Sequence, residues 1–109
     1  MTRFEVIILP SAEREIGEAY AWIAEYDADA AIRWYNRLME VIFSLDTFPE
    51  RCPLAPESDF FNVEIREIFY GRRQHKYRIL FTVSENEVHV LHVRHGARLA
   101  LGETETPDE

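Results

Sequence analysis

The chain of 109 residues contains one cysteine, Cys52, few basic side chains and no long apolar run. A single cysteine excludes an internal disulfide framework and is typical of a reducing compartment, so we expect a cytoplasmic protein. No segment approaches the roughly 18 consecutive apolar residues that predict a membrane-spanning helix. The opening "MTRFEVIILPSAERE" has only a short apolar run followed by acids, which predicts a strand rather than a signal peptide.

Basic residues are unevenly placed along the acidic chain, which has a formal net charge of −8 and a pI of about 5.0. Residues 1–65 carry 5 basic and 13 acidic side chains, whereas residues 66–98 carry 7 basic and 3 acidic side chains and all four histidines. Residues 99–109 add 4 acids and no base. The acidic total argues against nucleic-acid binding by the whole surface. The basic last third is therefore the first indication of function.

The first half of the chain has helical periodicity after a short β-branched run. Pro10 ends that run, and Ser11 is expected to cap the following helix, with acids in its first turn. "YDAD" interrupts the helical pattern, and Asp27 or Asp29 is expected to cap a second helix. The predicted elements are a strand over 3–9, a helix over about 12–25 and a helix running to about residue 46.

The second half has a period of two, which is typical of strands. Residues 47–62 contain three prolines and are predicted to form a loop. "GRRQ" and "SENE" are expected to be hairpin turns, with Asn86 in the left-handed conformation. The predicted strands cover 63–70, 77–83 and 87–93.

This order of elements predicts an α+β fold. An N-terminal strand and a two-helix antiparallel hairpin precede a three-strand antiparallel meander, with the helices packed on one face of a mostly antiparallel sheet. We expect a single domain over 1–98 and an acidic tail over 99–109. Only loops and the tail remain to cover the second face of the sheet, so that face is expected to receive a partner or a substrate.

The histidines are not spaced as metal ligands. His89 and His95 share a face of one predicted strand but lie roughly 20 Å apart, and His92 points to the other face. No cysteine or carboxylate completes a zinc set. The sequence therefore predicts neither a metal site nor a cofactor.

Basic side chains fall on three neighbouring predicted strands or at their ends, where they can converge on a phosphate. The alternative is a solvated rim in which they pair with Glu64, Glu67, Glu85 and Glu87. Arg78 lies inside the most apolar strand, where an unpaired charge would be costly. The basic set is Arg66, Arg72, Arg73, Lys76, Arg78, Arg94 and Arg98.

The segment "YGRRQHKYRILFTVSENEVHVLHVRHGAR" resembles the C-terminal half of the RelE/ParE superfamily, the toxins of type II toxin–antitoxin (plasmid stabilisation) modules. The similarity is concentrated in "KYRILFTV" and "VRHGAR". The order of the opening strand and helical hairpin agrees with it, so the resemblance covers residues 3 to about 98. It implies the same α+β fold and a cognate antitoxin as partner.

The resemblance implies two possible activities. RelE-like members are ribosome-dependent endoribonucleases that cut mRNA, whereas ParE-like members inhibit DNA gyrase and are not known as nucleases. Arg78 matches the strand arginine that RelE-like enzymes use at the scissile phosphate, and Arg98 matches the arginine that supports it. The strand lysines of RelE-like enzymes are replaced by "VEIREIFY", and "LALGETETPDE" lacks their tyrosine or histidine acid–base residue.

RNA cleavage through the 2′-hydroxyl requires a base, an acid and charge stabilisation. An unperturbed histidine titrates near neutrality, so His75, His92 and His95 are candidates in principle, although no spacing assigns them a role. His95 is the first candidate if the chain is a nuclease. An acidic chain is also poorly suited to a ribosomal RNA surface. These observations favour the ParE-like branch.

Three hypotheses follow: a gyrase-binding toxin, a metal-independent RelE-like ribonuclease with an altered acid–base set, and a non-toxic relic or co-repressor that binds only its antitoxin. In each case we expect a toxin–antitoxin hetero-oligomer. The resemblance implies that an acidic, partly disordered antitoxin segment folds over the basic surface and the helical hairpin. Trp22, Trp34 and Tyr35 are candidate antitoxin contacts, with core packing as the alternative role of each.

Overall fold

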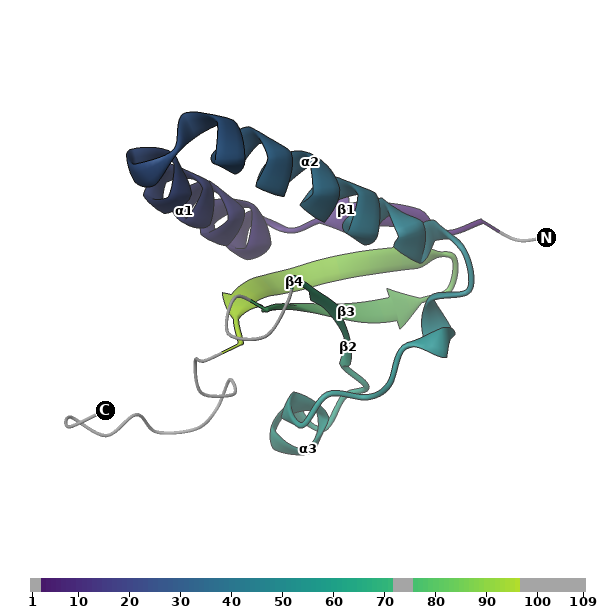
Figure 1. The fold of residues 1–109 in the computed structure, drawn as a ribbon. Helices are drawn as coiled ribbons and strands as arrows, with labels where there is room; N and C mark the ends of the chain where they lie inside the picture. Colours follow the sequence, from purple (N-terminus) through teal and green to yellow (C-terminus); the bar gives the residue numbers. More distant parts are fainter. Residues whose placement is uncertain (1–2, 72–75, 97–109) are drawn as a thin grey trace.

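The computed structural model describes residues 3–71 and 76–96, and its order of elements confirms the predicted α+β fold (Figure 1). Two 3-10 turns and one short helix lie between the hairpin and the meander. The elements are β1 (Glu5–Ile8), α1 (Pro10–Tyr26), α2 (Ala28–Phe43), η1 (Ser44–Asp46), η2 (Pro49–Arg51), α3 (Glu57–Phe61), β2 (Arg66–Tyr70), β3 (Tyr77–Ser84) and β4 (Glu87–His95).

The four strands form one mixed sheet in the order β1-β4-β3-β2. β4 pairs antiparallel with β3, and β3 pairs antiparallel with β2, whereas β1 runs parallel to β4. The register of β3 and β4 shifts between Leu80 and Phe81, where Leu91 is the extra residue of β4. The sheet is therefore mostly antiparallel, as predicted, with one parallel edge strand.

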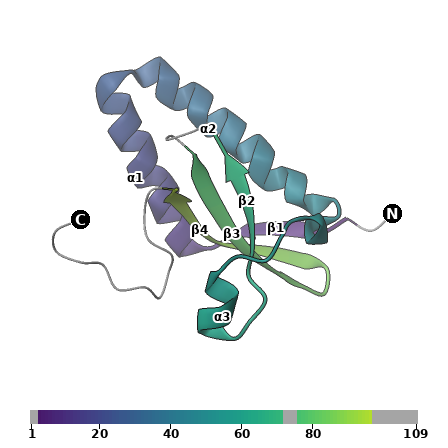
Figure 2. The same cartoon turned by 60° about the horizontal axis from the view of Figure 1, so that its bottom comes forward.

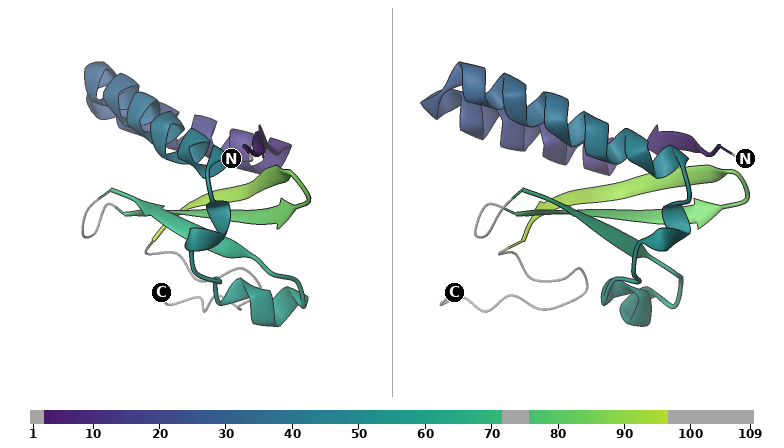
Figure 3. Two further views of the ribbon diagram at one scale, coloured as in Figure 1. Left: turned by 90° about the vertical axis from the view of Figure 1, so that its right-hand side faces the viewer. Right: turned by 45° about the vertical axis from the view of Figure 1, so that its right-hand side comes forward.

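The two long helices cover one face of the sheet, and α3 lies on the other side (Figures 2 and 3). Alternation along the strands divides the apolar residues accordingly. The larger core, between the sheet and the hairpin, includes Ile16, Leu38, Ile42, Ile79 and Phe81. A smaller core of Ala55, Ile65 and Leu80, with Leu91 against it, lies on the second face. That face is thus partly covered by an element that the sequence did not predict.

The predicted N-cap of the first helix is wrong. The helix begins at Pro10, whose missing N–H and fixed φ suit the first helical position, and its cap residue is Leu9, which has no side-chain hydrogen bond. The second helix has the expected cap, since Asp27 accepts from the Ala30 N–H at 3.1 Å. That helix ends at Phe43, before the predicted residue 46, because the chain tightens into η1.

The other corrections concern the loop and the turns. The proline-rich segment is not all loop, because η2 and α3 form within it. β2 begins at Arg66 rather than residue 63. In the hairpin between β3 and β4, Glu85 rather than Asn86 has a positive φ, of 54°. Of the other predicted turn, "GRRQ" over 71–74, Gly71 is described and has a positive φ of 103°, whereas residues 72–74 lie outside the described residues.

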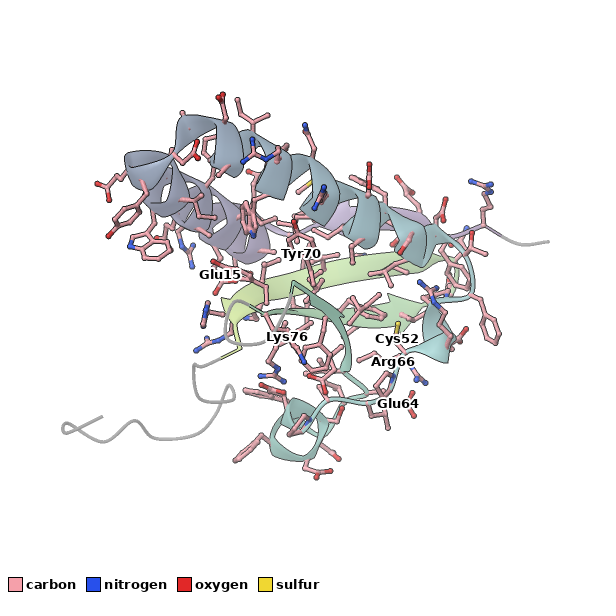
Figure 4. All side chains as sticks on the ribbon, viewed as in Figure 1. Glu15, Cys52, Glu64, Arg66, Tyr70 and Lys76 are labelled. Carbon is pink, nitrogen blue, oxygen red and sulfur yellow. The ribbon has the colours of Figure 1, made fainter. Side chains whose placement is uncertain are left out.

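Beyond the end of β1, side chains of α1 form hydrogen bonds with the backbone groups along the edge of β4. The Leu9 N–H donates to the Val90 carbonyl, and the chain then turns into α1. The Ser11 hydroxyl donates to the Leu91 carbonyl at 2.7 Å, and Glu15 Oε1 accepts the Val93 N–H at 3.0 Å. Figure 4 shows Glu15 directed from α1 toward the sheet. Ser11 and Glu15 therefore take the place of strand backbone groups and fix α1 against β4.

Among the described residues, no helix is long and apolar enough to cross a membrane.

Substitution of two glycines by alanine should change the free energy of unfolding in opposite directions. Gly96 donates its N–H to the Lys76 carbonyl at 2.7 Å, and a Cβ on Gly96 would lie 2.8 Å from that oxygen. Gly96→Ala should therefore lower the free energy of unfolding by about 1–3 kcal/mol in urea titrations. Gly17 lies within α1 with no atom within 4 Å of a Cβ, so Gly17→Ala should raise it by roughly 0.5–1 kcal/mol. Equal effects of the two substitutions would contradict the close approach at Gly96.

Candidate functional site

Arg78 is the centre of a buried ion cluster on the second face of the sheet. Its Nη1 and Nη2 donate to the two carboxylate oxygens of Glu57 at 2.9 and 2.7 Å. Its Nε and Nη2 donate to Glu67 Oε1 at 3.0 and 2.9 Å. Arg78 is 9% exposed and Glu57 is fully buried. Arg78 thus makes a bidentate interaction with Glu57 and bonds to a second carboxylate, that of Glu67. These bonds compensate the burial of its charge within an apolar strand.

Local structure of α3 brings Glu57 to this position. The Ser58 hydroxyl accepts the Ile65 N–H at 2.8 Å and donates to the Ile65 carbonyl at 2.9 Å. The Ala55 N–H also donates to Ile65, at 2.7 Å, and Asn62 ends the helix in the left-handed conformation. These bonds tie α3 to the segment that leads into β2, so that its first residue faces the sheet. The bonds to Glu57 raise the pKa of Arg78 above its ordinary value, which keeps the guanidinium charged.

Glu57 is the main residue of this cluster that sequence reasoning missed. Glu67, one of the acids proposed to pair with the basic rim, does bond to Arg78. Glu64 lies 3.8 Å from Arg66, and Glu87 bonds to His89 instead of an arginine. Glu57 lies in a proline-rich segment without periodicity, 21 residues before its partner. The available signal was Arg78 itself, since a cation within an apolar strand requires a carboxylate from elsewhere in the chain.

The other basic residues do not form one described patch. Arg66 Nη1 donates to the Cys52 carbonyl at 2.7 Å, and Figure 4 shows it beside Cys52 and Glu64. Lys76 Nζ lies 5.1 Å from the centre of the Phe69 ring. Arg94 is opposite Arg78 in the register of β3 and β4, so these two share the second face. Arg72, Arg73 and Arg98 lie outside the described residues.

The three described histidines lie in different environments. His89 Nε2 lies 3.1 Å from Glu87, His92 Nδ1 lies 3.1 Å from Glu15, and the His95 ring packs edge-on against Tyr77. His75 lies outside the described residues. Within 3–71 and 76–96, no three His, Cys, Asp or Glu side chains are grouped closely enough to hold a metal ion.

Burial shifts the pKa of three further groups in the same direction. Desolvation raises the pKa of the Cys52 thiol and of the Tyr70 and Tyr77 phenols. The Tyr70 hydroxyl donates to the Trp34 carbonyl at 3.0 Å. These three groups remain protonated at neutral pH, so none of them can accept a proton as a general base.

The hairpin aromatics divide between the core and the surface. Trp34 packs against Tyr77, with ring centroids 5.3 Å apart, and is partly buried on the larger core. Trp22 is 57% exposed and packs edge-on against Tyr26. Tyr35 is 40% exposed. Of the three proposed antitoxin contacts, Trp22 and Tyr35 are therefore available at the surface, whereas Trp34 has a packing role.

The fold and this site define a small α+β protein with a helical hairpin on one face of a mixed sheet and a charged cluster on the other. The sequence matches the family model of the ParE toxin of the type II toxin–antitoxin system parDE over residues 6–100. The chain therefore belongs to the ParE toxin family. A search of curated proteins gave no significant match.

The ion cluster predicts a large effect of substitution at Arg78. Arg78→Met removes both Arg78 bonds from the fully buried Glu57 carboxylate and should lower the free energy of unfolding by about 3–5 kcal/mol. The double variant Arg78→Met with Glu57→Leu removes both charges and should recover a large part of this loss. Unfolding in urea measures both changes. Arg14→Met, at an exposed position of α1, is the control and should stay within about 0.5 kcal/mol; a similar result for Arg78→Met would contradict the cluster.

Proposed function

We propose that this ParE-family protein inhibits DNA gyrase, and thereby replication, through protein binding, and that a cognate antitoxin neutralises it. The family assignment supports the class of toxin. The observation that carries the choice of mechanism is the engagement of Arg78 by Glu57 and Glu67. Arg78 is one of two residues, with Arg98, that match catalytic arginines of the alternative, a RelE-like ribonuclease.

The electrostatics of the cluster argue against phosphate chemistry at Arg78. Among the described residues, the Arg78 guanidinium bonds to two carboxylates, so its positive charge is already balanced by Glu57 and Glu67. Its donors are directed at Glu57 and Glu67 rather than at solvent. An incoming phosphate would have to displace a carboxylate from a site where Glu57 is fully buried. Because electrostatic stabilisation is the main catalytic requirement of RNA cleavage, this arrangement favours protein binding.

The proposed binding residues lie on two faces. Arg66, Lys76 and Arg94 are the described members of the proposed basic surface, and Trp22 and Tyr35 supply exposed aromatic anchors on the hairpin. Membership of the ParE family implies a cognate antitoxin as partner. We propose that the chain forms a toxin–antitoxin hetero-oligomer in the cytoplasm. The chain itself would comprise a single toxin domain over 1–98 and an acidic tail over 99–109.

The target is tested in cells and with purified gyrase. After induction without the antitoxin, pulse labelling should show that DNA synthesis falls before protein synthesis, with filamentous cells. The purified full-length protein should inhibit supercoiling by gyrase. Lys76→Ala should weaken this inhibition by roughly two- to fivefold, because a charge at the edge of an interface contributes modestly. Arg33→Ala, at an exposed position of α2, is the control with the same loss of charge.

Each other outcome rejects the proposal in a different way. If protein synthesis falls first and transcripts are cut, the chain is a ribonuclease. If neither synthesis falls and purified gyrase retains full activity, the chain is a non-toxic antitoxin-binding protein.

A further inference from the structure

A groove of about 580 Å³ lies between α1 and the end of β4. One wall comes from successive turns of α1 and the other from the ends of β3 and β4. It adjoins the exposed Trp22–Tyr26 pair, whose ring centroids are 5.3 Å apart. The lining residues are Glu15, Glu18, Ala19, Trp22, Tyr77, Val93 and His95.

The chemistry of this groove is acidic and aromatic. Glu18 is exposed and makes no ion pair within 4.0 Å with any residue in the described parts of the chain. Glu15 is held at the groove by the Val93 N–H and by His92. Trp22 and Tyr77 offer an indole and a phenol beside these two carboxylates. Carboxylates next to aromatic rings are suited to a guanidinium or an ammonium group, which gains both ion pairing and cation–π attraction.

The size and exposure of the groove suit a protein segment. Trp22 is 57% exposed and Tyr26 is 77% exposed, and large aromatic side chains of this kind are typical anchors of protein interfaces. α1 adds Glu25 near the same end of the helix, and Asp27 and Asp29 follow it, so the surroundings are also acidic. Charge complementarity therefore requires a basic occupant.

We infer that the α1–β4 groove binds a basic amphipathic segment of a partner protein, with an arginine or lysine against Glu15 and Glu18 and an apolar side chain against Trp22. Where that partner is the antitoxin, the inference rests on the proposed function. The antitoxin segment that covers the hairpin would then be basic, whereas the resemblance implied an acidic one. An acidic segment is suited to the basic residues of the last strands, whereas this groove selects the opposite charge.

Two fluorescein-labelled model peptides test the inference by fluorescence anisotropy with the full-length protein. Both peptides have leucines at helical spacing. All the remaining positions are arginine in one peptide and glutamate in the other. The arginine peptide should bind and the glutamate peptide should not. Glu18→Lys should weaken binding by about fivefold and Trp22→Ala by about tenfold, because Trp22 is the proposed anchor. Both residues are exposed, so circular dichroism should show an unchanged fold.

The matched control is Glu40→Lys, which makes the same charge change at an exposed position of α2 outside the groove. Equal losses for Glu18→Lys and Glu40→Lys would mean non-specific attraction to an acidic protein and would overturn the inference. Binding of the glutamate peptide would also overturn it. Tighter binding of the arginine peptide to full-length Arg98→Ala than to Arg33→Ala, which loses the same charge on α2, would indicate that the chain's own Arg98 competes for the groove and would also overturn the inference. Gyrase inhibition, measured separately on the same variants, tests the proposed function independently.

Discussion

The bond between Arg78 and Glu57 is the constraint on which the second face of the sheet depends. It joins the central strand β3 to α3, and Glu67 adds the edge strand β2 to the same cluster. Among the described residues, the apolar core on this face is small, with Ala55, Ile65 and Leu80 buried in it. A charged cluster therefore does much of the positioning that a larger apolar core would otherwise do. Its geometry matters more than its net energy, because buried ion pairs stabilise little relative to apolar groups but are costly to break.

The opposite face is organised by a different device. β1 is only four residues long and leaves β4 with unpaired edge groups, which Ser11 and Glu15 satisfy from α1. This arrangement sets the position of α1 relative to the sheet and, through the hairpin, that of α2. It also keeps the carboxylate of Glu15 at the wall of the α1–β4 groove. One side chain thus contributes to the fold and to the surface at which we place a basic partner segment.

The sequence predicted what depends on local pattern and missed what depends on contacts between distant segments. Periodicity identified the two long helices and three strands, and Asp27 was among the predicted caps because capping involves only three residues. Ser11 was misassigned because its hydroxyl bonds to Leu91, 80 residues away, rather than to its own helix. α3 has five residues and no detectable period, so Glu57 could not be placed. The resemblance to a nuclease arginine identified Arg78 as special, but only the fold shows that its partners are carboxylates.

The separation of charge along the sequence becomes a separation of surfaces in the fold. The acidic first half forms α1 and α2, whereas the described cations of the last third lie on the strands or directly before one. Among these cations, Arg78 is already neutralised by its own carboxylates. Among the described residues, the surfaces that we propose for partners include an acidic, aromatic hairpin on one side and Lys76 and Arg94 on the other. A single partner segment of one sign cannot complement both. An antitoxin that covers both faces would therefore need segments of opposite charge, whereas a target that binds only one face would leave the other accessible.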